Sequence, residues 1–142
     1  MIKAKRILVG LKTLELAVSL TDLACRAGAH KGTLLLLHVI EIPDVTPLDV
    51  GLPLLETNAQ KILRAAERVA KRSRIKVEKQ VLRAHWAGTA LVEAMKDEKI
   101  DLAVLGYHHG RSFGEFLLGT TAQYVARHAP CHVLLSIPKR TR

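Results

Sequence analysis

The chain has 142 residues, of which 49% are hydrophobic and 4% aromatic, and its formal net charge is +9. This hydrophobic content excludes a disordered chain, and no apolar run reaches the roughly 18 residues that a membrane-spanning helix needs. Residues 1–6 lead straight into an apolar segment and lack the pattern of a signal peptide. We therefore expect a cytoplasmic protein in which Cys25 and Cys131 are reduced thiols.

The first predicted strand is the apolar run 6–11, and Thr13 is a candidate N-cap for the helix that follows. Gly28 or Gly32 is suited to end this helix. Residues 33–40 form a continuous apolar run, which is typical of a central parallel strand covered on both faces.

Prolines and a glycine between 43 and 53 mark a loop, and residues 54–72 repeat apolar positions at helical spacing. Residues 75–82 alternate apolar and polar side chains, so we expect a strand more exposed than 33–40. A helix is predicted from Gly88 to Lys99, a strand at 101–106, a helix at 119–128 and a strand at 132–137. This alternation predicts one α/β domain over residues 1–142, with a five-stranded parallel sheet and helices on both faces.

A ligand of such a sheet binds beyond the carboxyl ends of the strands, where the strand order reverses. The segment 105–122 is the most informative of these positions. Its glycines permit close backbone approach, and residues 119–121 begin a helix whose free N–H groups favour phosphate. Arg111 adds a cation. The alternative is a plain strand–helix connection whose glycines serve packing and helix caps.

The same segment resembles the universal stress protein (UspA-like) family, whose ATP-binding members carry the motif Gly-x2-Gly-x9-Gly-Ser/Thr. Gly106 matches its first glycine, and Gly119 with Thr120 matches its last pair. The resemblance extends to residues 7–9, 37–39 and 129–135. It implies an adenine nucleotide alpha hydrolase-like, Rossmann-like fold with strand order 3-2-1-4-5, and a homodimer formed through the last strand, His132–Ile137.

The resemblance also implies a site for ATP or another adenine nucleotide, with which Mg²⁺ would be compatible. Its lining would comprise Gly10, Leu11, Lys12, Val39, Leu105, Gly106, His108, Gly110, Gly119, Thr120 and Thr121, with Arg111 and Ser112 as phosphate neighbours. The sequence departs from the family at two places. His109 takes the place of the middle glycine, and Lys12 stands where ATP-binding members have Asp. Lysine cannot accept hydrogen bonds from ribose hydroxyls. Three alternatives for this site therefore remain: a nucleotide in an altered pose, another anionic ligand, or no ligand.

We expect no catalytic residues and no metal site. No Gly-x-Ser-x-Gly elbow is present, and Glu115 offers only a base for slow ATP hydrolysis. Adjacent histidines such as His108 and His109 seldom ligate one ion together. Trp86 and Tyr107 are expected to be packing or pocket-wall residues, and not platforms on which a base stacks.

Three functions remain at this level. The first is a ligand-sensing module in a stress response. The second is a domain that binds no nucleotide and docks to a partner such as a membrane transporter, since the chain also resembles stress-protein domains associated with transporters. The third, nucleic-acid binding, ranks last, because the basic clusters at 3–6, 71–74 and 139–142 contain no interleaved aromatic residues.

Overall fold

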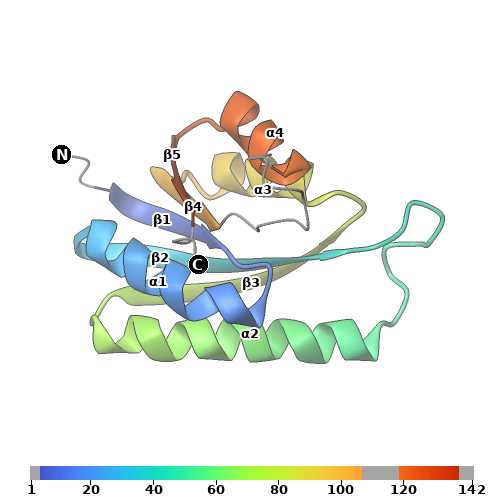
Figure 1. Cartoon of the computed structure of the whole chain (residues 1–142), viewed down its shortest axis with the longest axis horizontal. Helices are drawn as coiled ribbons and strands as arrows, with labels where there is room; N and C mark the ends of the chain where they lie inside the picture. Colours follow the sequence, from blue (N-terminus) through green and yellow to red (C-terminus); the bar gives the residue numbers. More distant parts are fainter. Residues whose placement is uncertain (1–3, 107–118, 138–142) are drawn as a thin grey trace, which may run out of the picture.

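The computed structural model describes residues 4–106 and 119–137. Its elements alternate in the predicted order: β1 (Ala4–Gly10), α1 (Leu14–Ala27), β2 (Gly28–Glu41), α2 (Pro53–Arg72), β3 (Lys76–Ala84), α3 (Ala87–Asp97), β4 (Leu102–Gly106), α4 (Thr120–His128) and β5 (His132–Ser136). The strands form one parallel sheet in the order β3-β2-β1-β4-β5 (Figure 1). The predicted fold class and strand order are therefore confirmed.

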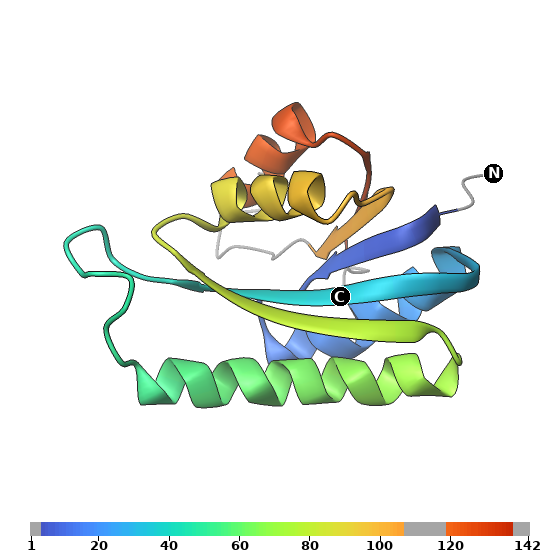
Figure 2. The ribbon, with the colours of Figure 1, turned by 180° about the vertical axis from the view of Figure 1, so that it is seen from behind.

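The helices form a layer on each face of the sheet (Figure 2). Because successive strand residues point to opposite faces, β1 sends Ile7 and Val9 towards α1 and α2, and Leu8 towards α3 and α4. The same alternation in β2 places Leu36 in the first cluster and Leu37 in the second. Each apolar strand thus supplies both halves of the core.

Exposure across the sheet follows the strand order. Residues 34–38 of β2 are all buried, whereas no residue of the edge strand β3 is fully buried. The prediction that residues 75–82 are more exposed than 33–40 is confirmed. Cys25 and Cys131 are free thiols, and burial raises the pKa of Cys131. None of the helices in the described part of the chain combines the length and the apolar character that crossing a bilayer requires.

Three local expectations need correction. β2 begins at Gly28, not at residue 33, because Gly28 pairs with Ala4 of β1 before a register irregularity. Thr13 occupies the N-cap position of α1, but its side chain makes no cap hydrogen bond. α3 ends at Asp97 because Lys99 adopts a left-handed conformation (φ 51°), and the Ile100 N–H turns back to Met95 O at 3.0 Å.

Candidate functional site

The strand order reverses between β1 and β4. The chain runs outward from β1 through β2 to β3, then returns to add β4 on the opposite side of β1. At the carboxyl end of β1, Gly10 pairs with Leu37 of β2 and with Leu105 of β4. The predicted residues after the first and fourth strands are therefore adjacent, at the place where open α/β sheets bind ligands.

The turn between β1 and α1 is fixed by hydrogen bonds to β2. The Leu11 N–H donates to Leu37 O at 2.8 Å, and the His38 ring nitrogen Nδ1 lies 2.6 Å from Leu11 O. Leu11 is only 2% exposed. Both its backbone groups and its side chain are thus engaged by the protein, so Leu11 shapes the turn and offers little surface to a ligand. Lys12, the next residue, is exposed.

His38 is a residue of this edge of the sheet that the sequence analysis did not single out. It is 6% exposed and lies in the otherwise apolar core of β2. Because a carbonyl oxygen can only accept, the contact with Leu11 requires the proton on Nδ1. Its position could have identified His38 from the sequence, because it is a polar residue within an apolar strand. A polar group buried in such a strand needs a hydrogen-bond partner.

Thr13 follows Lys12 at the amino end of α1. Its Oγ1 atom is buried and has no hydrogen-bond partner among the described residues. An unpaired buried hydroxyl carries a desolvation cost, so a ligand that reached it would relieve that cost. From the sequence, Thr13 was interpreted as an N-cap, because threonine is a common N-cap residue. A role in ligand binding was therefore not considered for it.

Two glycines of the predicted site lie in close contact with leucine side chains. A Cβ atom on Gly10 would lie 2.5 Å from Leu105 Cδ2, and one on Gly106 would lie 3.0 Å from Leu16 Cδ1 and from Leu20 Cδ1. Leu105 is itself buried in the core cluster on the α3–α4 side of the sheet, and Val39 packs against that cluster. Gly10, Val39, Leu105 and Gly106 therefore form the floor of the site at the carboxyl edge.

The amino end of α4 is different, because no described side chain packs against it. No described atom lies within 4 Å of a Cβ placed on the N-cap residue Gly119, whose φ of −59° any residue can adopt. The first helical bond runs from the Gln123 N–H to Gly119 O at 3.0 Å. The N–H groups of Thr120, Thr121 and Ala122 therefore have no acceptor within the helix.

An aromatic contact holds this end of α4 at the carboxyl edge. Trp86, the N-cap residue of α3, meets Tyr124 of α4 edge to face with ring centroids 4.6 Å apart. Tyr124 also stacks on His128 at 4.3 Å. The packing role expected for Trp86 is confirmed. Tyr107, His108, His109, Gly110, Arg111, Ser112 and Glu115 lie outside the described residues.

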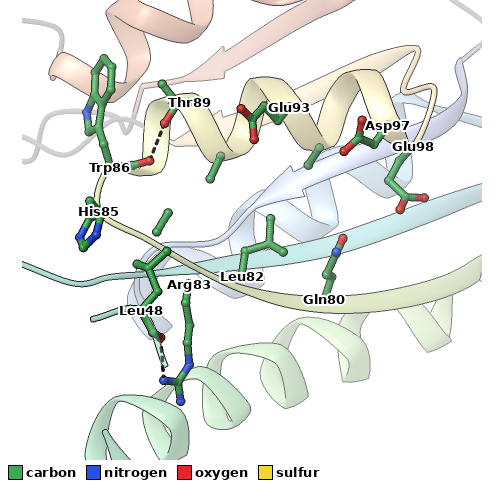
Figure 3. Close-up of a pocket in the computed structure, with 13 residues that line it drawn as sticks. Leu48, Gln80, Leu82, Arg83, His85, Trp86, Thr89, Glu93, Asp97 and Glu98 are labelled. Carbon is green, nitrogen blue, oxygen red and sulfur yellow. Dashed lines mark hydrogen bonds between the residues drawn. The ribbon is translucent and has the colours of Figure 1, made fainter. Parts of the chain in front are cut away.

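A separate groove of about 450 Å³ runs between β3 and α3 (Figure 3). Beside it, Arg83 of β3 donates to Leu48 O at 3.1 Å and to Val50 O, and pairs with Glu56 of α2. Arg83 thereby fastens the loop between β2 and α2. No predicted site residue of the described part lines this groove, which is bordered by Gln80, Leu82, Trp86, Thr89, Glu93, Asp97 and Glu98 among others.

Comparison with known proteins agrees with the fold. The model of the universal stress protein family matches residues 3–136. A Thermus aquaticus protein described as "universal stress protein in QAH/OAS sulfhydrylase 3′region" is 32% identical over 137 residues, covering 87% of this chain and 97% of the relative.

Two solved structures of universal stress proteins have the same fold. The protein from Archaeoglobus fulgidus in complex with dAMP has a TM-score of 0.69 and 15% identity, covering 95% of this chain and 98% of that one. An Arabidopsis thaliana family member with AMP bound has a TM-score of 0.66 and 13% identity, covering 95% and 92%.

The His38 contact yields a stability prediction. We expect His38→Ala to lower the free energy of unfolding by about 1–3 kcal/mol, because Leu11 O is left unpaired. His38→Asn retains an N–H donor near the Nδ1 position and should recover part of the loss. Urea unfolding measures both. Equal losses in the two variants would show that side-chain volume, and not the hydrogen bond, is responsible.

Proposed function

Because the chain belongs to the universal stress protein family, we propose that it binds an adenine nucleotide at the carboxyl edge of its sheet and acts as a ligand-sensing module in a stress response. The dAMP and AMP in the two solved relatives support this class of ligand. They favour it over the alternative of a domain that only docks to a partner.

The observation that carries the proposal is the amino end of α4, against which no described residue packs. Its first-turn N–H groups lack helical acceptors, and the space beside Gly119 is free of described atoms. The helix dipole adds a partial positive charge at this end. A phosphate group satisfies the free donors and complements the dipole, so we assign the nucleotide phosphate to Gly119, Thr120 and Thr121.

The β1–α1 turn forms the other wall of the proposed site. Lys12 contributes a cation at its exposed surface, which suits an anionic ligand better than a ribose. Thr13 Oγ1 contributes an unpaired buried hydroxyl. We therefore expect the ligand to contact this turn through its phosphate or another anionic group. The ribose should then be oriented differently than in family members whose Asp at this position binds it.

The proposed activity is binding, without a catalytic step. Mg²⁺ would enter with the nucleotide, held chiefly by its phosphates, because the described residues bring no three His, Cys, Asp or Glu side chains together. His108, Gly110, Arg111 and Ser112 complete the proposed site on the basis of their positions in the family motif.

We also infer that two copies associate along β5. This strand ends the sheet, and its apolar residues Val133, Leu134 and Leu135 are only partly buried. A strand at the edge of a sheet is prone to pair with another chain. Pairing of two copies would cover it.

Ligand binding should appear as thermal stabilisation. An adenine nucleotide at about 100 times its dissociation constant adds about 2.7 kcal/mol, which raises the Tm by roughly 5–10 °C for a chain of this size. Scanning fluorimetry with AMP, ATP, ATP with Mg²⁺, adenosine and inorganic phosphate measures the shift. An unchanged Tm with every adenine compound would refute nucleotide binding.

A pair of variants links the shift to Thr13. Thr13→Val removes the unpaired hydroxyl, so the free protein should keep or gain stability while the nucleotide-induced shift decreases. Thr21→Val is the matched control, because Thr21 Oγ1 is also buried and unpaired but lies in the middle of α1. If Thr13→Val and Thr21→Val bind nucleotide equally well, Thr13 is not part of the site.

The phosphate position is tested at Gly119. Gly119→Asp places a preferred N-cap residue on α4, so the Tm of the free protein should stay the same or rise. The added carboxylate repels phosphate, so we expect nucleotide affinity to fall at least about tenfold. Gly119→Ser caps the helix without charge and should bind better than the Asp variant. Similar affinity for both would place the phosphate elsewhere.

Association along β5 is tested by sedimentation. We expect the wild type to sediment as a dimer and Leu134→Lys to sediment as a monomer, because a buried lysine at the joined edge is costly. Leu14→Lys, on the exposed surface of α1, should remain dimeric. A monomeric wild type would contradict the inferred dimer.

A further inference from the structure

The outer face of α2 carries a row of basic residues. Lys61, Arg64, Arg68, Lys71 and Arg72, here called the α2 cation stripe, are all exposed. At 100° per residue they fall within an arc of about 100°, and from Lys61 to Arg72 they extend over about 17 Å. Figure 2 shows α2 along one border of the molecule, with its axis aligned with β2 and β3.

The charge of the stripe is not compensated within the described chain. None of its five residues forms an ion pair with a described carboxylate. The two acidic residues of α2 are engaged elsewhere, because Glu56 pairs with Arg83 and Glu67 pairs with Lys79 at 3.2 Å. The helix therefore presents five cations that no described carboxylate neutralises.

Exposed aliphatic side chains accompany the cations. Leu54, at the amino end of α2, falls in the same arc and is 86% exposed. On α1, which packs beside α2 in the same layer, Leu14 and Val18 are spaced by one helical turn and are each 50% exposed. Of the acidic residues of α1, Asp22 pairs with Arg26 and Glu15 is exposed.

We propose that the α1–α2 face docks on an anionic lipid bilayer, with α2 lying along the membrane surface. The cations contact acidic headgroups, and Leu54 enters the interface beside them. The exposed aliphatic residues favour lipid over nucleic acid, since α1 and α2 contain no aromatic residue on which a base could stack. None of the residues named for this surface is assigned to the nucleotide site, so the inference goes beyond that function.

The experiment measures co-sedimentation of the full chain with vesicles of phosphatidylcholine alone, or of phosphatidylcholine mixed with phosphatidylserine. We expect binding to the anionic vesicles only, weakening as ionic strength rises. The triple variant Lys61→Gln, Arg64→Gln, Arg68→Gln should bind anionic vesicles about 100-fold more weakly. Each cation near the membrane raises the affinity about fivefold, and the variant removes three of them.

The control variant Lys5→Gln, Lys96→Gln, Arg127→Gln has the same net charge but leaves the stripe intact, since its exposed residues lie on β1, α3 and α4. It should bind vesicles nearly as well as the wild type. Leu54→Ser should reduce the binding that survives at high ionic strength. Thermal melts check that every variant is folded.

Three results would overturn the inference. The first is no binding of the wild type to anionic vesicles at low salt, whether or not it binds duplex DNA or an acidic polypeptide. The second is an equal loss in the stripe variant and the control, which would make net charge the cause. The third is equal binding to neutral and anionic vesicles. A nucleotide-induced Tm shift is measured separately, so either proposal can fail alone.

Discussion

The central position of β1 is the constraint on which this structure depends. Its residues Ile7, Leu8 and Val9 have no exposed surface, and its backbone pairs with β2 on one side and β4 on the other. A strand in this position must be apolar on both faces. It also fixes where the strand order reverses, and hence where the β1–α1 turn and the amino end of α4 can jointly surround a ligand.

The strands that the sequence predicted best are the ones that the core requires. The run 33–40 could be identified from composition because nearly every residue of a doubly covered strand is apolar. Its extension to Gly28 could not, because Gly28 pairs with Ala4 through its backbone and carries no apolar side chain that would mark a strand. The contact of Arg83 with two loop carbonyls was equally hidden, since backbone acceptors leave no signature in a sequence.

The candidate site could also be predicted only in part from the sequence. Glycines at 10, 106 and 119 were identified through the family resemblance, but only coordinates separate their surroundings. Gly10 and Gly106 lie against leucine side chains, whereas no described atom lies beside Gly119. The His38 bond and the unpaired Thr13 hydroxyl depend on which strands are neighbours. Residue types alone do not contain that information, because both residues are compatible with several roles.

The contact between Trp86 and Tyr124 has a practical consequence. Trp86 is the only tryptophan in the chain, and it is 39% exposed. Fluorescence excited selectively at tryptophan therefore comes from one position, at the junction of α3 with the first turns of α4. The protein thus contains a built-in optical probe beside the helix end to which we assign the phosphate, and its emission reports rearrangements there without any attached dye.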